Sequence, residues 1–331
     1  MNYFKSFAQD ILQLKINDFD AMALTLFRHQ AEDNPIYKAF LKARRIDVSK
    51  VHQVEDIPFL PIRFFKDHEV FCGPKSGFEG FYSSSGTTGM ITSRHFFWSE
   101  EFYLQHALNL FEKIFGKITD YHVLALLPAY LERKGSSLVS MADYFIKKSA
   151  SSESGFYLYN YTELVQKLHL LKGGNRKVLL LGVTFALLDL AEGGFGLPLM
   201  DNLIVMETGG MKGRRKEMIR EELHDILRTA FGLATIHSEY GMTELMSQAY
   251  SKGGGKYELP PTMKVFLRDV NDPWSWSTRS QGGINIIDLA NFHSCAFIET
   301  QDLGKLSTDG MLEVLGRIDN SEIRGCNLMV N

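Results

Sequence analysis

The chain has 331 residues, of which 36 are basic and 39 acidic, and its net charge is −3. Hydrophobic residues make up 45% and charged residues 23%, a balance typical of globular proteins and unlike that of disordered chains. The lack of a basic excess argues against nucleic acid or an anionic membrane as the main partner.

The cysteines and the apolar segments exclude further classes of protein. Cys72, Cys295 and Cys326 are far apart and odd in number, so they predict neither a disulfide framework nor a zinc site. Free thiols fit a reducing cytoplasm. Residues 1–15 lack the apolar core of a signal peptide, and the most apolar run, 178–188, is too short to span a bilayer. We therefore expect a cytoplasmic protein without a membrane span.

The first third of the chain predicts helices joined by an extended segment. Apolar residues in 19–27 recur at helical spacing behind Asp18, which we expect to be an N-cap. Asn34 precedes Pro35, a residue favoured at the first position of a helix, so a second helix is expected to start there. Two prolines within 54–70 then favour an extended path.

The middle of the chain opens with a helix between Ser99 and Gly116. Its predicted buried stripe consists of Leu104, Leu108, Phe111 and Phe115. Short apolar runs then alternate with helical segments, at 121–128, 177–183, 202–210 and 233–241. The clearest of these helices is expected to bury Ile219, Leu223, Ile226 and Ala230. Buried strands that alternate with helices predict an α/β fold.

Strand-like pieces and turns follow Tyr250, at 263–270, 282–290, 295–300 and 310–318. The sequence has no internal repeat and no long linker. We therefore expect a single core over 1–331, with α/β subdomains in 1–250 and a β-rich subdomain in 251–331.

The segment 83–89, SSSGTTG, is rich in small and hydroxylated residues. A loop of small residues lets backbone N–H groups converge on a phosphate, and hydroxyls add further donors. Neither the GxxxxGK[ST] loop nor the GxGxxG fingerprint is present. On composition alone, a flexible Ser/Gly loop and a phosphate-binding loop are equally well supported.

Later motifs favour the phosphate-binding loop. SSSGTTG, YGMTE, QDLG and GRIDNSEIRG occur in this order and resemble the phosphate loop, the YGxTE motif, the TGD motif and the hinge motif of adenylate-forming enzymes, the acyl- and aryl-CoA synthetase superfamily. IPFLPIRFFK, LPAYLERKGSSL and METGGMKGRRKE extend the resemblance over nearly the whole chain to the LuxE-type acyl-protein synthetases. The resemblance implies the large N-terminal domain of these enzymes, with mixed sheets flanked by helices and a β-rich subdomain at its end.

The resemblance also implies a binding site for ATP and Mg²⁺. The residues around the phosphates would be Ser84, Ser85, Gly86, Thr87, Thr88 and Gly89. Arg94 stands in place of the lysine that is usual at the phosphate loop, and an arginine can bind phosphate through two N–H groups. The adenine would be bordered by Thr208, Gly209, Gly210, Tyr240 and Gly241, with Tyr240 stacked on the base.

The same motifs imply roles for four further residues. Thr243 would contact phosphate, and Glu244 would hold Mg²⁺, which prefers oxygen ligands. Asp302 would accept hydrogen bonds from the ribose hydroxyls, and Arg317 would lie near the same ribose. Two alternatives remain open: Glu244 as an acid at the start of a helix, and Asp302 as a turn residue.

The sequence ends at Asn331, shortly after the hinge motif, so the small C-terminal domain of the superfamily, with its lysine, is expected to be absent. Acyl-protein synthetases pass the activated acyl group to a cysteine near their own C-terminus, and Cys326 is the candidate here. Arg324 would lower its pKa. The alternative is a small, half-buried structural cysteine.

These features predict ATP-dependent activation of a carboxylic acid, with a fatty acid as the expected class, and transfer of the acyl group to a thiol. One alternative is an acyltransferase that takes acyl groups from a carrier thioester without adenylation. The other is a non-catalytic nucleotide- or acyl-binding subunit that needs a partner. The partners expected for the protein are a fatty acid or other carboxylic acid and an acyl carrier protein or a reductase.

Overall fold

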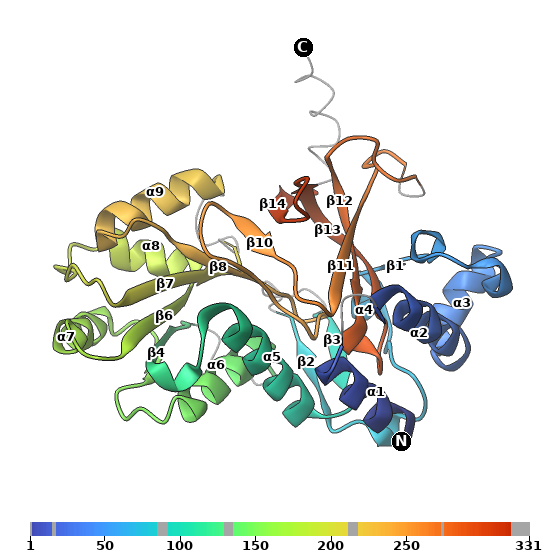
Figure 1. Ribbon diagram of the computed structural model, residues 1–331, viewed down its shortest axis with the longest axis horizontal. Helices are drawn as coiled ribbons and strands as arrows, with labels where there is room; N and C mark the ends of the chain where they lie inside the picture. Colours follow the sequence, from blue (N-terminus) through green and yellow to red (C-terminus); the bar gives the residue numbers. More distant parts are fainter. Residues whose placement is uncertain are drawn as a thin grey trace, which may run out of the picture. The chain divides into compact units, whose positions relative to one another are not determined.

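The computed structural model describes residues 2–14, 18–84, 92–128, 135–210, 218–272 and 275–318 (Figure 1). The chain divides into two units that interleave along the sequence. Unit 1 draws on Met1–Tyr103, Thr243–Ser247 and Leu259–Asn331, and unit 2 on Leu104–Met242 and Gln248–Glu258. The subdivision at residue 250 that the sequence suggested stays a prediction.

The helices of unit 1 lie near the N-terminus of the chain. They are α1 (Asn2–Leu12), α2 (Phe19–Asp33), α3 (Pro35–Ala43) and the short α4 (Phe64–Asp67). Pro35 opens α3 as predicted, and the Asn34 side chain accepts hydrogen bonds from the backbone N–H groups of Ile36 and Tyr37, both at 3.0 Å. Asp18 precedes α2 as predicted, but its side chain makes no capping hydrogen bond.

The main sheet of unit 1 is mixed. Its antiparallel strands are β11 (Met263–Arg268), β12 (Gln281–Asp288), β13 (Phe297–Leu306) and β14 (Leu312–Arg317), in that spatial order. The short β1 (Leu60–Pro61) pairs with β13 in parallel. A separate hairpin consists of β2 (Gly80–Ser83) and β3 (Arg94–Phe97), which pair antiparallel. This hairpin brackets the predicted phosphate loop.

The sheet of unit 2 has the order β10-β9-β8-β7-β6-β4-β5. Its strands are β4 (Tyr121–Leu126), β5 (Gly155–Tyr157), β6 (Lys177–Val183), β7 (Leu203–Thr208), β8 (His237–Tyr240), β9 (Ala249–Ser251) and β10 (Lys256–Glu258). The strands β5, β4, β6, β7 and β8 run in parallel, and β9 and β10 add antiparallel pairs. The α/β fold and the mixed sheets predicted from the sequence are therefore confirmed.

The remaining helices are α5 (Glu100–Phe115), α6 (Ser137–Lys148), α7 (Tyr161–Leu171), α8 (Thr184–Glu192) and α9 (Arg220–Phe231). Figure 1 shows α8 and α9 on one side of strands β6 and β7, and α6 on the other. Helices on both faces explain why the parallel strands are apolar almost throughout. Across the described residues, no helix has the length and apolar character needed to cross a membrane.

Two predicted helix faces are wrong by a fraction of a turn. In α5, Leu104 and Leu108 are only half-buried, and the buried side includes His106. Ile219 precedes α9 and is 68% exposed, whereas His224 is buried in that helix. A pattern of apolar residues does not count histidine, although a neutral or paired imidazole can be buried. The predicted buried faces of α5 and α9 were therefore misplaced.

Candidate functional site

The residues expected around adenine lie at the ends of two neighbouring strands of unit 2. Thr208 is the last residue of β7, and Tyr240 is the last residue of β8. The parallel register sets Thr208 opposite Glu239, so the two strand ends lie side by side. Carboxyl ends of parallel strands are where ligands bind in α/β sheets. The structure thus brings these predicted residues together.

The turn after β7 is held by a hydroxyl from α8. Thr184 donates its hydroxyl proton toward the carbonyl oxygen of Gly209 at 2.9 Å, and it is also 3.2 Å from the carboxylate of Glu207. Gly209 has a φ of 71°, in the left-handed region that favours glycine. The METGG motif therefore contains a glycine because the backbone turns sharply where β7 ends.

Glu239 fixes the neighbouring strand end. Its buried carboxylate accepts a short hydrogen bond from the hydroxyl of Thr208. A Cβ atom at position 241 would collide with the same carboxylate, so glycine is needed at Gly241. The Glu239 carboxylate thus borders both Thr208 and Gly241, although Glu239 itself precedes the YGMTE motif.

An ion pair between Glu207 of β7 and Arg220 of α9 stabilises these strand ends. Glu207 is 2% exposed, and its Oε1 lies 3.0 Å from Nη1 of Arg220, at the start of α9. Arg220 also donates a short hydrogen bond to the hydroxyl of Tyr257, and His224 Nε2 lies 3.6 Å from the Glu207 carboxylate. Burial by itself would raise the pKa of Glu207, but Arg220, His224 and Ser238 together hold it below its ordinary value. Glu207 is therefore a stable anion.

The segment 243–247, which carries Glu244, belongs to unit 1 and is held by Asp288. The Asp288 carboxylate accepts hydrogen bonds from the backbone N–H groups of Met246 and Ser247 at 2.8 and 2.9 Å, and from the Ser247 hydroxyl at 2.7 Å. The Asn291 side chain donates to the carbonyl oxygen of Glu244 at 2.8 Å. Burial raises the pKa of Asp288, and these hydrogen bonds oppose that shift.

Glu244 is buried, and no helix begins at it, so the alternative interpretation as a helix-start acid is wrong. Burial raises the pKa of Glu244, while the Ser93 hydroxyl and the charges of Lys66 and Arg317 act in the opposite direction. A bound cation would stabilise the charged form of a buried carboxylate whose pKa is raised in this way.

The donor set of unit 1 fits Mg²⁺ bound together with phosphate. Among the described residues, no cluster of three or more His, Cys, Asp or Glu side chains is arranged to hold a metal ion. A dedicated all-protein metal cage is thus not found in that part of the chain. Mg²⁺ is commonly held by one or two carboxylates plus the phosphates of a substrate, a role that Glu244 alone can fill.

Asp302 and Arg317 lie opposite each other on β13 and β14. Their side chains form an ion pair, with Nε and Oδ1 3.8 Å apart. Asp302 is only 16% exposed, whereas the Arg317 side chain is 87% exposed. Asp302 lies within a strand, so the alternative interpretation as a turn residue is wrong. Arg317 is thus an exposed cation and Asp302 a largely covered anion, which fits the roles predicted for them at a ribose.

The base of the predicted phosphate loop is an extension of the β2–β3 hairpin. Ser84 and Ser93 pair through their backbones at 3.1 Å, and the Ser84 hydroxyl accepts from the Ser93 N–H at 3.0 Å. Arg94 forms an ion pair with Glu69 at 3.3 Å and lies over the ring of Phe81. The loop residues Ser85, Gly86, Thr87, Thr88 and Gly89 lie outside the described residues.

The described cysteines are buried free thiols, as the sequence predicted. Burial raises the pKa of Cys72 well above its ordinary value and that of Cys295 to about 12. Neither is a ready nucleophile, because the thiolate is the reactive form. Cys326, the predicted acyl acceptor, lies outside the described residues.

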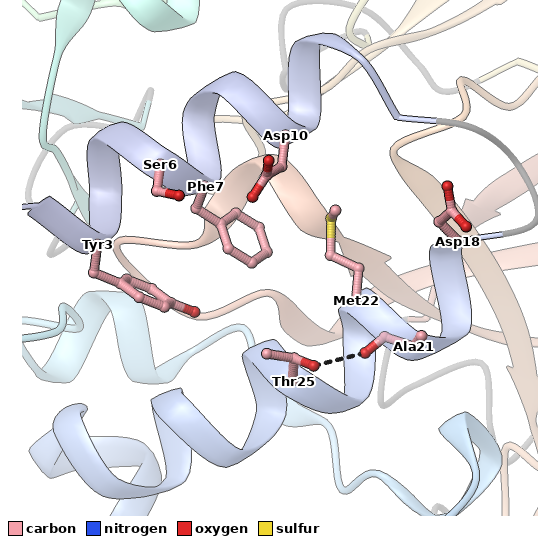
Figure 2. A pocket seen from close by; sticks show the side chains of 8 residues that line it. All are labelled: Tyr3, Ser6, Phe7, Asp10, Asp18, Ala21, Met22 and Thr25. Atoms are coloured by element: carbon pink, nitrogen blue, oxygen red, sulfur yellow. Dashed lines mark hydrogen bonds between the residues drawn. The ribbon is translucent and has the colours of Figure 1, made fainter.

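A groove of about 360 Å³ lies between α1 and α2, away from every predicted site residue. Figure 2 shows Phe7 and Met22 facing the space between the helices, with the carboxylates of Asp10 and Asp18 at one end. Its described lining residues combine apolar surface with acidic groups and include no cation, so they do not suit a nucleotide.

Several residues that build the site were missed by sequence reasoning. They are Lys66, Ser93, Glu207, Arg220, Glu239, Asp288 and Asn291. Glu207 and Glu239 directly precede residues of the motifs, so a charged residue at the end of an apolar strand was a usable signal. The others act between residues far apart in the sequence, 13 apart for Glu207 and Arg220 and 41 apart for Ser247 and Asp288, and no local pattern marks them.

Solved structures share this fold. A 2-hydroxyisobutyryl-CoA ligase, in complex with 2-HIB-AMP and CoA, is 15% identical with a TM-score of 0.67, over 91% of this chain and 67% of its own. ATP-bound MatB from Rhodopseudomonas palustris is 16% identical with a TM-score of 0.53, over 74% and 49%. A luciferase-like enzyme from the nonluminescent mealworm Zophobas morio is 14% identical with a TM-score of 0.50, over 75% and 60%.

The chain therefore shares its fold with these three proteins, and it spans about half to two thirds of their lengths. The sequence matches no protein-family model, and no curated protein matches it. At these identities the likeness concerns the fold.

Proposed function

We propose that this protein activates a carboxylic acid by forming an acyl-adenylate from ATP. The observation that carries this proposal is Glu244, a buried carboxylate whose pKa is raised. Asn291 donates a hydrogen bond to the backbone carbonyl oxygen of Glu244, and Asp288 accepts one from the backbone N–H of Met246. It occurs within YGMTE, in a fold shared with a CoA ligase solved with an acyl-AMP and with an ATP-bound protein.

The residues predicted to bind the nucleotide are taken for each unit by itself. In unit 2, Thr208, Gly209 and Gly210 would border the adenine, and Tyr240 would stack on it. Thr184 and Glu239 hold the two strand ends that carry these residues. Rigid positioning lowers the entropic cost of bringing two substrates together. In unit 1, Asp302 and Arg317 would contact the ribose, and Thr243 the phosphates.

Glu244 would hold Mg²⁺, and the ion would neutralise charge on the phosphates when it is bound. The substrate carboxylate forms a bond to the α-phosphorus, and the bond from that phosphorus to the pyrophosphate oxygen breaks. The products are the acyl-adenylate and pyrophosphate. The binding residues contribute by orientation and charge stabilisation, since no proton needs to move in this step.

The acyl group would then pass to a thiol. A thiolate attacks the acyl carbonyl carbon, a thioester forms, and AMP leaves with the electron pair. We propose Cys326 as the acceptor and a fatty acid as the acyl donor, on the resemblance to acyl-protein synthetases. An acyl carrier protein or a reductase would be the partner that receives the acyl group.

Carboxylate-dependent exchange between labelled pyrophosphate and ATP tests the adenylation step. We expect exchange with at least one member of a series of fatty acids of increasing chain length. Glu244→Gln should lower its rate by roughly 100-fold or more, as loss of a charge-stabilising group does. Glu55→Gln, at an exposed position, is the matched control and should leave the rate unchanged. Exchange that is unaffected by Glu244→Gln would contradict the role of this residue.

Labelling with a radioactive fatty acid and ATP tests the transfer step. We expect a hydroxylamine-sensitive label on the wild-type protein and none on Cys326→Ser. Labelling from an acyl thioester without ATP would instead support an acyltransferase. ATP binding in calorimetry, without exchange and without labelling, would support a non-catalytic subunit.

A further inference from the structure

The strand β13 departs from regular pairing next to Asp302. The register between β12 and β13 shifts between Gly283 and Asn285. Ile284 consequently stands opposite the longer segment 300–302. A bulge of this kind bends the strand and turns its side chains in a new direction, and bulges are common beside functional sites. The direction of the Asp302 side chain is therefore set by the bulge.

The side chain of Thr300 closes this bulge. Thr300 is buried, and its hydroxyl donates to the carbonyl oxygen of Ile284 at 2.8 Å. The same hydroxyl oxygen accepts a hydrogen bond from the backbone N–H group of Asp302 at 3.1 Å. One hydroxyl thus ties the backbone of Asp302 to the neighbouring strand β12.

The guanidinium of Arg268, the last residue of β11, binds both strands at the bulge. Arg268 is 5% exposed, and its Nη1 donates to the carbonyl oxygen of Ile284 at 3.0 Å and to Oδ1 of Asn285 at 2.9 Å. Its Nη2 donates to the carbonyl oxygen of Thr300 at 2.7 Å, and its Nε lies 3.8 Å from the Glu299 carboxylate. A guanidinium is planar and presents its N–H groups in a fixed geometry, so it holds these acceptors in a fixed relation to one another.

Two glycines make room for these contacts. A Cβ atom at Gly283 would lie 2.6 Å from Cζ of Arg268, and one at Gly304 would lie 2.6 Å from Cδ1 of Ile284. Glycine within a strand commonly marks such a close approach. Gly283 and Gly304 therefore belong to the same arrangement as Arg268 and the bulge.

We propose that Arg268 and Thr300 position the Asp302 carboxylate for the hydroxyl groups of a ribose, and that they thereby set a preference for nucleotides that carry these hydroxyls. This inference rests on the role proposed for Asp302 in adenylation. Arg317 flanks the same carboxylate from β14 at 3.8 Å. A hydrogen bond from a hydroxyl is lost when its acceptor moves beyond about 3.5 Å or turns out of line. Release of the bulge would therefore cost the hydrogen bonds to the ribose hydroxyls.

Calorimetry with AMP and with 2′,3′-dideoxy-AMP, which lacks both hydroxyls, tests this role without turnover. The wild type should bind AMP at least about 10-fold more tightly, because hydrogen bonds to a charged acceptor are among the stronger ones. Thr300→Val should lower this ratio to about 2 and leave the affinity for dideoxy-AMP within about 2-fold of the wild type, because only the ribose hydroxyls lose their acceptor. Thr300→Ser keeps the hydroxyl and should restore the ratio. Thr308→Val, at an exposed position of the same unit, is the control and should keep the wild-type ratio.

Two further variants test the guanidinium and the path through Asp302. Arg268→Lys keeps a buried cation but loses the fork that binds both strands, so the ratio should fall by about 5-fold. Arg279→Lys, at an exposed position, is its control and should keep the wild-type ratio. In an Asp302→Ala background, Thr300→Val should change neither affinity further, because the residue through which it acts is gone.

A merely structural role for Thr300 and Arg268 predicts a different result. Variants that weaken the binding of both nucleotides equally, or that lower the unfolding midpoint in urea and keep the wild-type ratio, would overturn the inference. A wild-type ratio near 1 would overturn it as well. Absence of pyrophosphate exchange in the wild type would refute adenylation, and the ratio of affinities would still decide whether Arg268 and Thr300 position Asp302.

Discussion

The two units hold their predicted site residues by opposite electrostatic means. In unit 2, the half-buried cation of Arg220 lies 3.0 Å from the buried carboxylate of Glu207 and neutralises it. In unit 1, neutral N–H and hydroxyl groups surround the carboxylate of Asp288, which holds the segment of Glu244. The pKa of Glu207 is consequently lowered and that of Asp288 raised. The difference would suit the proposed function, with rigid walls around adenine in unit 2 and a carboxylate in unit 1 that can bind a cation.

The largest expected effect comes from breaking the ion pair of unit 2. Arg220→Met leaves Glu207 buried and uncompensated, so the free energy of unfolding should fall by about 3–5 kcal/mol. Urea denaturation measures this change. The double variant Glu207→Gln with Arg220→Met should recover part of the loss, because no charge then remains buried. A loss below about 1 kcal/mol in Arg220→Met would show that the pair does not support the strand ends.

The corresponding change in unit 1 should cost less. Asp288→Asn keeps the shape of the side chain but replaces a charged acceptor with an amide whose N–H₂ faces backbone donors. We expect a loss of about 2–3 kcal/mol in unfolding free energy and weaker Mg²⁺ dependence of exchange. Asp56→Asn, at an exposed position, is the control. Equal stability of the two variants would contradict the role of Asp288.

The pH dependence of stability should have opposite signs in the two units. The folded-state pKa of Glu207 is lowered, so its contribution is present above the ordinary value of 4.5 and is lost as pH falls through the folded pKa. The pKa of Asp288 is raised, so its contribution is present below the ordinary value of 3.8 and is lost as pH rises through the folded pKa. Denaturation of the wild type, Glu207→Gln and Asp288→Asn between about pH 3 and 7 measures both slopes. Slopes of the same sign would refute the comparison.

The smallest expected effect concerns Thr208, which we propose borders the adenine. Thr208→Val removes the hydroxyl that donates to Glu239 and keeps the volume of the side chain. We expect a loss of about 1 kcal/mol in stability and weaker binding of AMP in calorimetry. Thr235→Val, at an exposed position of the same unit, should change neither. Unchanged AMP affinity in Thr208→Val would remove Thr208 from the nucleotide site.

Sequence reasoning located the strands well because their patterns are local. The predicted run 177–183 coincides with β6, and the predicted runs at 202–210 and 233–241 contain β7 and β8. Buried parallel strands are continuous apolar stretches, which are easily recognised. The motifs at the ends of these strands were therefore placed correctly with them.

The supporting network could not be predicted in the same way. Asp288 is a lone acid after an apolar strand, and only folding brings it to Met246, 42 residues earlier in the chain. Such roles arise from tertiary contacts between distant residues, and a single sequence carries no local record of them.

The central claim is that Glu244 supports acid-dependent adenylation. The most direct test is exchange of labelled pyrophosphate into ATP across a range of Mg²⁺ concentrations, in the wild type and in Glu244→Gln. The account predicts exchange that requires both a carboxylic acid and Mg²⁺ and that falls by roughly 100-fold in the variant. Exchange of equal rate in both proteins, or none in the folded wild type with any acid, would contradict it.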